Sequence, residues 1–359
     1  MGEKRHAFRP DYAVLPGDTV LEVLRSLGMT QAELAGRTGR PRKTINEIIK
    51  GKAAITAETA IQFEMVLGVP ASMWLGLERD YQETVARTKE SRELVLAKGW
   101  LDGLPVRKMV EYGWLEDRGD PAGKVREALS FFGVASPEAW QVVWTAPDAA
   151  LRESKAFQSQ PGAVAAWLRR GEIEARRIEC RPHSSRLFRE TLGRVRSLTG
   201  GSVDGIEKSL ASLCAEAGVA VVFVPELPGA RVSGATRWLA PDKALLQLSL
   251  RYRTDDQLWF TFFHEGAHIL LHGKQARIEE EDGVSGEEEE ASRFAADFLI
   301  PPKQYRAFTC AHRRPTKRAV ASFAAELGIA PGIIVGRLQH DGFVPWGHLN
   351  GLKRKLTWA

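Results

Sequence analysis

Residues 262–271 read Phe-Phe-His-Glu-Gly-Ala-His-Ile-Leu-Leu, so two histidines stand four positions apart in a largely apolar run. Positions four apart share one face of an α-helix, which lets both imidazoles reach a single metal ion. The stretch therefore predicts a helix that carries a zinc site, with His264 and His268 as ligands and Glu265 beside them.

This helix has recognisable ends. Thr254 is expected to cap its start, with Gln257 three residues on as the capping-box partner, and Gly273 follows its last apolar residues. Gly266 weakens a helix interior, and we expect it to leave room for a substrate or a neighbouring strand.

Two histidines leave a catalytic zinc short of a third protein ligand. Four glutamates, residues 287–290, precede an apolar helix face that includes Ala291 and Ala295. Glu288 lies on that face and is the expected ligand, with Glu287 as the alternative, because a carboxylate on an apolar face is costly unless it is paired or bound to metal. The other two glutamates are expected to point towards solvent, at the end of an acidic loop that starts near residue 279.

The chemistry expected at such a site is hydrolysis. Glu265 would take a proton from a zinc-activated water and pass it to the leaving amine. Arg237 and Tyr252 are candidates to stabilise an oxyanion, and the apolar run 243–250 predicts a strand that an extended peptide could join. His272 is expected to face the dipole at the helix C-terminus, with the cleft edge as the alternative.

The overall composition limits the class of protein. The chain has 359 residues, a formal net charge of +5 and the composition of a globular protein. Cys180, Cys214 and Cys310 are far apart and form no Cys-x-x-Cys pair, which argues against a disulfide framework. We expect reduced, partly buried thiols; the alternative is that one of them fills the fourth metal position.

No targeting or membrane segment is evident. Residues 1–16 are basic and polar, without an apolar signal core, and the longest apolar stretch, 219–224, is far too short to span a bilayer. The protein is expected to be cytoplasmic and to have no membrane partner. The arginine-rich stretch 169–189 is expected to be a solvated helical face, and the tryptophans between residues 100 and 167 to mark packed surfaces.

At residues 262–273 and 288–302 the sequence resembles the ImmA/IrrE family of metallopeptidases, and the resemblance covers roughly residues 200–345. It implies a zincin-like fold and intracellular cleavage of one or a few regulatory proteins, often repressors. Ser292 replaces an asparagine that the family often has there, a change that bears on a hydrogen bond behind a metal ligand.

Residues 10–85 resemble the lambda-repressor type of helix-turn-helix, and most of all its HigA antitoxin branch. The helix that starts at Pro41 would be the recognition helix, anchored by Ile45, Ile48 and Ile49. We expect Arg42 to suit a guanine edge and Asn46 an adenine edge. The full set of expected DNA contacts is Gln31, Arg42, Lys43, Thr44, Asn46, Glu47, Lys50 and Lys52.

The sequence thus predicts a multidomain protein, in which an all-α helix-turn-helix domain precedes a mainly helical α+β zincin-like metallopeptidase domain. The expected parts are the DNA-binding domain at 1–92, a helical connecting region at 93–200, the metallopeptidase core at 201–305 and a closing helical segment at 306–359.

The leading functional hypothesis is a DNA-binding transcriptional regulator with a zinc-dependent (Zn²⁺) endopeptidase. Its expected partners are double-stranded operator DNA, a protein substrate such as a repressor or antitoxin-system partner, and a second copy in a homodimer. The alternative is a HigA-like repressor or antitoxin whose peptidase fold senses or binds with little turnover. Helix-turn-helix domains also serve as protein-binding modules. A second alternative is therefore that residues 10–85 bind a protein rather than DNA.

Overall fold

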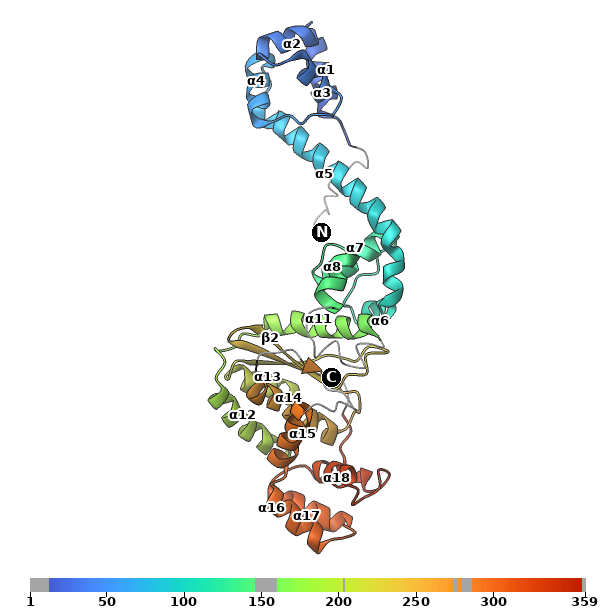
Figure 1. Ribbon diagram of the computed structural model, residues 1–359, viewed down its shortest axis with the longest axis vertical. Helices are drawn as coiled ribbons and strands as arrows, with labels where there is room; N and C mark the ends of the chain where they lie inside the picture. The colour runs from blue at the N-terminus through green and yellow to red at the C-terminus, as the bar shows by residue number, and fades with distance from the viewer. Residues whose placement is uncertain (1–12, 146–159, 203, 274–276, 279–285, 357–359) are drawn as a thin grey trace, which may run out of the picture. The chain divides into compact units, whose positions relative to one another are not determined.

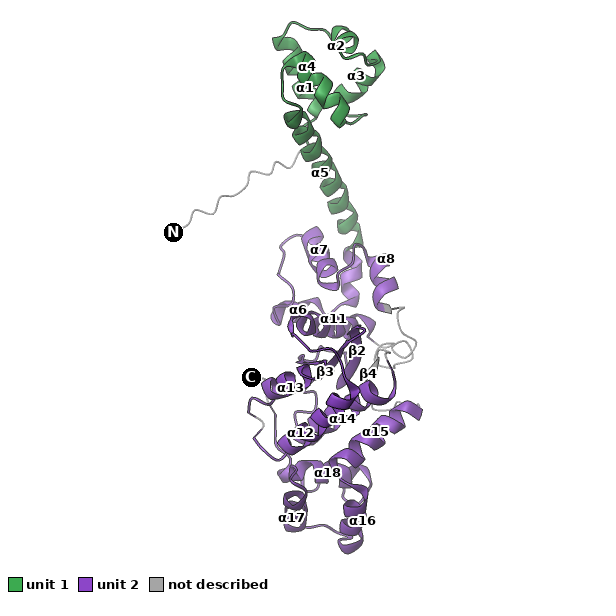
Figure 2. Cartoon of the chain, turned by 90° about the vertical axis from the view of Figure 1, so that its left-hand side faces the viewer, with its two compact units in different colours: residues 1–97 green, residues 98–359 purple. Residues whose placement is uncertain are grey.

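The computed structural model describes residues 13–145, 160–202, 204–273, 277–278 and 286–356. The chain divides into two compact units, Met1–Ala97 and Lys98–Ala359 (Figure 2). Helices make up the described part of the first unit, and a mainly helical second unit contains a small mixed sheet. The predicted fold class is confirmed.

The first unit consists of helices whose ends follow from local sequence. Its elements are α1 (Pro16–Ser26), α2 (Gln31–Thr38), α3 (Arg42–Ile49), α4 (Ala57–Leu67) and α5 (Ala71–Leu96) (Figure 1). Thr30 and Glu33 form the complete capping box at the start of α2, and Gly39 ends that helix in the left-handed conformation. A Cβ at Gly17 would lie 2.2 Å from the carbonyl oxygen of Ile49, so α1 and α3 approach backbone to backbone where only glycine fits.

Helix α5 runs without interruption from Ala71 to Leu96. Residues 77–96 contain no glycine or proline, and the pairs Glu83–Arg87 and Lys89–Glu93 lie one turn apart along the helix. Such pairs support an exposed helix in the absence of a breaking residue.

The second unit is layered around its sheet. The strands β1 (Val219–Phe223), β2 (Gly234–Ala240), β3 (Lys243–Leu248) and β4 (Arg277–Ile278) lie in the order β1-β3-β2-β4. β3 runs parallel to β1 and antiparallel to β2. Because β3 is paired on both sides, the expectation that an extended peptide could join this strand is wrong.

Alternating side chains divide the core into two layers. Ala220, Val222 and Leu245 face one cluster, and Val221 and Leu246 face the other. The first cluster includes residues of α11 (Pro161–Arg177), and the second includes residues of α12 (Ser185–Leu198), α13 (Ile206–Ala215) and α14 (Asp255–Leu271). Figure 1 shows α11 on the opposite side of the sheet from α12, α13 and α14. Before α11 come η1 (Ala97–Gly103), α6 (Val106–Glu111), α7 (Pro121–Phe132), α8 (Pro137–Trp140) and η2 (Gln141–Thr145).

The tryptophans and arginines of residues 100–196 have structural roles. Trp114, Trp140, Trp144 and Trp167 are buried in the α11 layer, which confirms that they mark a packed surface. Several of the arginines form ion pairs with glutamates along their own helices, such as Arg170 with Glu174 and Arg186 with Glu190. Arg186 is exposed, as expected for the solvated helical face that the sequence predicted, whereas Arg170 is half-buried.

Helix α14 is buried on nearly all sides, because almost every residue from Leu258 to Ile269 lies in the core. Thr254 stands at its N-cap, but its side chain makes no capping bond, so the capping box expected with Gln257 is wrong. The backbone of Thr254 instead pairs with that of Lys355 in an isolated antiparallel bridge.

The segment 353–356 holds the start of α14 in place. Arg354 Nε lies 2.7 Å from Asp255 Oδ2, and Lys353 Nζ lies 2.7 Å from Asp256 Oδ2. Both aspartates are buried, and Arg354 also donates to the carbonyl oxygens of Thr199 and Gly201. Two basic residues thus compensate the carboxylates that burial would otherwise penalise.

After α14 the described chain continues through α15 (Gly286–Leu299), α16 (Pro302–Ala311), α17 (Lys317–Leu327), α18 (Pro331–His340) and η3 (Asn350–Leu352). The expected polar N-terminal residues 1–12 and the loop part 279–285 lie outside the described residues. In the described ranges no single helix has both the length and the apolar character of a membrane span. Only α17 and α18 together, bent by 115° between them, meet that test by length and composition.

Removal of Arg354 should expose the role of segment 353–356. We expect Arg354→Ala to lower the free energy of unfolding by about 2–4 kcal/mol, because it leaves the buried carboxylate of Asp255 uncompensated. The loss is set below that of a deeply buried pair since 31% of the Arg354 side chain is exposed. Urea denaturation of the full chain measures it.

The neighbouring exposed residue is the matched control. Lys355→Ala removes one positive charge from the same segment and should change the unfolding free energy by no more than about 0.5 kcal/mol. Equal effects of the two substitutions would show that Arg354 does not anchor α14.

Candidate metal centre

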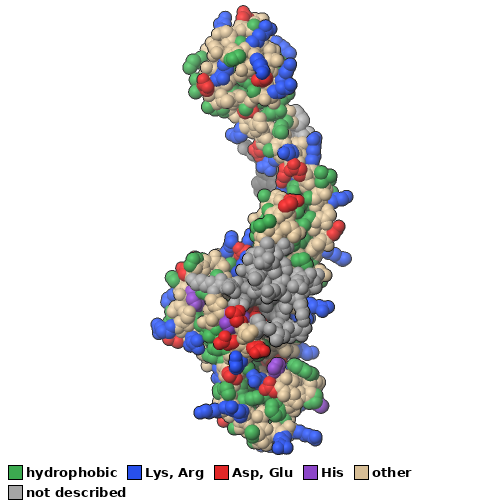
Figure 3. Space-filling view, in the orientation of Figure 1, with side chains coloured by type: hydrophobic (Ala, Val, Ile, Leu, Met, Phe, Trp, Pro, Cys, Tyr) green, Lys and Arg blue, Asp and Glu red, His purple; other side chains and the backbone are tan. Residues whose placement is uncertain are grey.

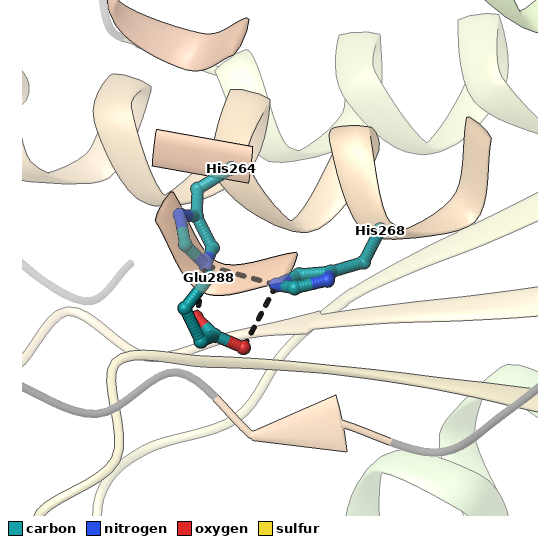
Figure 4. A group of neighbouring side chains, drawn as sticks. All are labelled: His264, His268 and Glu288. Carbon is teal, nitrogen blue, oxygen red and sulfur yellow. Dashed lines mark hydrogen bonds and ion pairs between the residues drawn. The ribbon is translucent and has the colours of Figure 1, made fainter. Parts of the chain in front are cut away.

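Helices α14 and α15 bring two imidazoles and a carboxylate to one point. His264 and His268 project from the same face of α14, and Glu288 reaches them from the first turn of α15 (Figure 4). The Nε2 atoms of the two histidines lie 3.0 Å apart, and the two Glu288 oxygens lie 3.0 Å and 3.2 Å from His264 and His268 respectively. We call these three residues the triad.

The triad has the size and chemistry of a zinc site. Ligand atoms held about 2.0–2.1 Å from a tetrahedral ion stand about 3.3 Å from one another, close to the spacing seen here. Two imidazole nitrogens and one carboxylate oxygen are a common donor set for catalytic zinc, with one position left open. Among the described residues, the candidate metal-binding group consists of these three side chains.

Of the two glutamates considered as third ligand, α15 turns Glu288 towards the histidines. The Glu287 side chain is exposed and does not belong to the group, although it has contacts of its own. The helical argument explains the difference, since Glu288 shares a face with the buried Ala291 and Ala295.

Electrostatics favour the forms of these groups that bind metal. Burial alone would raise the pKa of Glu288, but its hydrogen bonds with His264 and His268 outweigh burial and hold that pKa well below its usual range. Burial also lowers the pKa of His268, against the opposing pull of Glu288. An ionised carboxylate and a neutral imidazole are the states that a cation requires.

Further contacts orient both imidazoles. Ser292 Oγ lies 3.2 Å from His264 Nδ1, so the serine that replaces the family's asparagine still reaches the ligand. His272 Nδ1 lies 2.8 Å from His268 Nδ1, and His272 Nε2 lies 3.2 Å from Glu290 Oε2. If His264 and His268 donated through Nδ1, to Ser292 and His272, their Nε2 lone pairs would be available to a metal ion in place of the contacts with Glu288, and His272 could donate to Glu290 through Nε2.

Two contacts here were not expected from the sequence. Glu290 is exposed, as expected, but its carboxylate also contacts His272. His272 stands at the C-cap of α14, and its ring contacts His268. The spacing of four residues from His268 to His272, the same as within the zinc motif, was the signal that could have indicated this contact.

The proposed base, Glu265, is fully buried on α14. A Cβ placed on Gly234 would come within 2.7 Å of Glu265 Oε1, so glycine at the start of β2 makes room for this carboxylate. Gly266 serves a different neighbour from the one expected. A Cβ there would lie 3.3 Å from Leu192, so this glycine faces α12 rather than a substrate or a strand.

A cleft of about 820 Å³ opens beside the triad. Its lining includes His264, Glu288 and Ser292 as well as Tyr252, one of the two residues considered for an oxyanion. Arg237, the other, is not among the residues that line it. The Arg237 side chain lies over the Trp144 ring and 3.8 Å from Glu172, so it does not serve the cleft.

The three cysteines lie outside the triad and are not disulfide-bonded. Cys214 is buried, which raises its pKa to about 12, and Cys180 is half-buried. Cys310 is exposed on α16, so the expectation of partial burial is wrong for this residue.

In the first unit, α3 presents its polar side chains outward. Ile45, Ile48 and Ile49 are buried as predicted, while Arg42 and Lys43 are exposed. Thr44, Asn46 and Glu47 are half-buried on the same helix, as is Gln31 at the start of α2; Lys50 and Lys52 are exposed just after α3. Figure 3 shows several Lys and Arg side chains on the surface of this unit.

Comparison with known proteins finds a family match in each of the two units. The helix-turn-helix family matches residues 20–74, and the IrrE N-terminal-like domain matches residues 222–339. The resemblances inferred from the sequence are thereby confirmed.

Two individual proteins are similar to the first unit. An uncharacterized HTH-type transcriptional regulator of Escherichia coli (strain K12), YddM, is 36% identical over 63 residues, which are 18% of this chain and 67% of YddM. An addiction module antidote protein of a HigA family from Coxiella burnetii is 28% identical, with a TM-score of 0.22, over 23% of this chain and 90% of that structure.

The contact between His272 and His268 yields a prediction about metal affinity. We expect His272→Ala to weaken zinc binding about 10- to 100-fold, because His268 loses the acceptor that fixes its ring and tautomer. Titration against a competing chelator measures the affinity. Glu289→Gln, an exposed glutamate on the same helix, is the control and should bind zinc like the parent. If His272→Ala and the control are indistinguishable, the ring of His272 does not orient the ligand.

Proposed function

We propose that this chain, which belongs to the HTH-type transcriptional regulators and carries an IrrE N-terminal-like domain, is a DNA-binding regulator with a zinc-dependent endopeptidase in its second unit. The observation that carries the proposal is the triad at the wall of the 820 Å³ cleft, with Glu265 next to His264 on the same helix.

His264, His268 and Glu288 would hold the zinc ion in this proposal. A bound zinc ion would supply Lewis-acid activation of water and of a peptide carbonyl near neutral pH. Ser292 and His272 keep the two imidazoles in the required orientation.

Glu265 is proposed to accept a proton and return it to the departing amine. Ser233 lines the cleft and the next residue, Gly234, packs against Glu265, so the carboxylate lies directly behind the cleft wall.

One observation favours the second candidate, a HigA-like repressor or antitoxin whose peptidase fold senses or binds with little turnover. The Glu265 side chain is fully buried, and it is not among the residues that line the cleft. A base sealed from the cleft would leave the fold able to bind a partner without cleaving it.

The DNA-binding half of the proposal rests on α3. Its exposed and half-buried polar residues are carried by a buried isoleucine face, the arrangement that lets a recognition helix enter the major groove. We propose that Arg42 and Asn46 read base edges, and that Gln31, Lys50 and Lys52 contact phosphates. Lys43, Thr44 and Glu47 complete the proposed surface, and two copies of the chain would read a palindromic operator.

The peptidase proposal predicts a clean separation of binding from turnover. Glu265→Gln should bind zinc like the parent and lose about 10²–10⁴-fold in peptide cleavage, because the proton acceptor is gone while the ligands remain. Zinc content is measured by metal analysis. Cleavage is measured by the new protein N-termini that appear in cells expressing each chain.

Glu289→Gln is the matched control and should cleave like the parent, since this exposed glutamate is outside the triad. If Glu265→Gln retains zinc and yields the same new N-termini as the parent, the peptidase proposal fails and the sensor alternative stands.

The DNA proposal predicts two different losses. Arg42→Ala should reduce the free energy of DNA binding by about 1–3 kcal/mol and relax the sequence preference at one base pair. Lys50→Ala should weaken binding to all DNA sequences alike and reduce the slope of log K against log salt concentration by about 1. Binding to the DNA upstream of the chain's own gene, titrated at several salt concentrations, measures both.

Arg87→Ala, an exposed arginine on α5, serves as the control and should bind DNA like the parent. Absence of DNA binding by the parent chain at low salt would count against the DNA proposal, because the phosphate contribution is largest there.

A further inference from the structure

The cleft beside the triad is lined by more cations than anions. Arg231, Arg251, Arg293, Arg337 and Lys353 line it, against Asp256 and Glu288. We propose that this cleft selects an acidic peptide segment, in which one or more carboxylates flank an apolar residue. As a statement about substrate, the inference rests on the proposed peptidase function.

Some of these charges are already compensated within the protein. Lys353 Nζ lies 2.7 Å from Asp256 and 2.8 Å from Gln339 Oε1, which it needs to hold the start of α14. Arg337 Nε lies 2.7 Å from Asp341. Lys353, Arg337 and the lining carboxylate of Asp256 are therefore engaged in ion pairs within the fold. The other lining carboxylate, Glu288, is engaged by the histidines.

Arg231 and Arg293 differ from these cations. Both side chains are exposed, and across the described residues neither forms an ion pair. Arg251 extends the charge of Arg231, since its guanidinium donates to the Arg231 carbonyl at 3.0 Å and lies over the ring of Tyr252. In the described part of the chain, the lining cations that no ion pair compensates are therefore Arg231 and Arg293, while Arg251 is engaged by its own contacts.

The position of Arg293 links this charge to the proposed chemistry. It follows Ser292, which contacts His264, so its cation is carried on α15 close to the triad. A carboxylate of a bound peptide could pair with Arg293 or Arg231 while the backbone beside it reaches the triad. Clefts lined by one sign of charge focus the field and favour ligands of the opposite sign.

Apolar residues also line the cleft, beside uncharged polar ones such as Ser233 and Gln257, and they argue for a peptide over a nucleic acid. Phe260, Leu299, Ile300, Ile333 and Trp346 line the same cleft. A lining that mixes apolar side chains with a few charges suits a side chain and its backbone better than a sugar-phosphate chain. The volume of 820 Å³ accommodates several residues of an extended peptide.

The test measures binding separately from cleavage. The zinc-loaded full chain carrying Glu265→Gln is titrated, by fluorescence anisotropy at low salt, against two labelled peptides. Both have a Phe-Leu centre, flanked by glutamates in one and by lysines in the other. The glutamate peptide should bind at least about tenfold tighter, and the difference should shrink as salt screens the charges.

Charge reversal at the cleft is compared with the same reversal elsewhere. Arg231→Glu/Arg293→Glu should abolish or invert the preference. Arg186→Glu/Arg194→Glu changes the net charge equally on the exposed face of α12, where these arginines pair with Glu190 and Glu216, and should retain it. Circular dichroism and zinc content confirm that both double variants fold.

Equal affinity for the two peptides, no measurable binding of the glutamate peptide, or equal loss in both double variants would overturn the inference. So would a single-stranded oligonucleotide that binds more tightly than the glutamate peptide and depends on the same two arginines. If the parent chain cleaves neither peptide while the acidic preference persists in Glu265→Gln, the binding assignment stands and the peptidase proposal fails.

Discussion

The second unit depends on the burial of two imidazoles and a carboxylate at one point between α14 and α15. Groups of this kind are costly in an apolar core unless each polar atom is satisfied. Here the two Nε2 atoms lie 3.0 Å apart, and each lies 3.0–3.2 Å from a different oxygen of Glu288, while Ser292 and His272 contact the far side of each ring. The packing of the unit holds α14 in the position that brings its two histidines to Glu288. The sheet and α12 cover it, and segment 353–356 neutralises the aspartates at its start.

The parts of the structure that local sequence determines were predictable. The four-residue spacing of His264 and His268, the apolar face that turns Glu288 inward, and the capping box of Thr30 all depend on residues within one or two helical turns. Local sequence did not predict contacts between residues far apart in the chain. The capping box expected at Thr254 is absent, and the backbone of Thr254 instead pairs with that of Lys355, about a hundred positions away.

Two further differences between prediction and structure also arise from contacts between residues far apart in the chain. Strand β3 looked available to a peptide because alternation reveals which residues are buried, not which strands lie on either side. The contact between Glu290 and His272 joins two helices, and no periodicity within one helix could indicate it. The excess positive charge of the cleft is likewise invisible in sequence, since Arg231, Arg251 and Arg293 come from separate elements.

The proposed function places two activities in one chain. A helix-turn-helix unit would keep the peptidase cleft near a chosen DNA site, where the effective concentration of a DNA-bound partner is high. Cleavage would then remove a regulator at the place where it acts, and a demand for acidic segments at the cleft would limit which proteins are cut. This is the functional meaning we attach to the pairing of the two units.

X-ray absorption spectroscopy at the zinc edge on the full chain would show whether His264, His268 and Glu288 bind zinc. We expect one zinc per chain with nitrogen and oxygen neighbours only, at about 2.0–2.1 Å, including the outer scattering of two imidazoles. A sulfur neighbour at about 2.3 Å would place one of the cysteines on the metal and contradict the proposed ligand set. Failure to retain stoichiometric zinc would contradict the claim altogether.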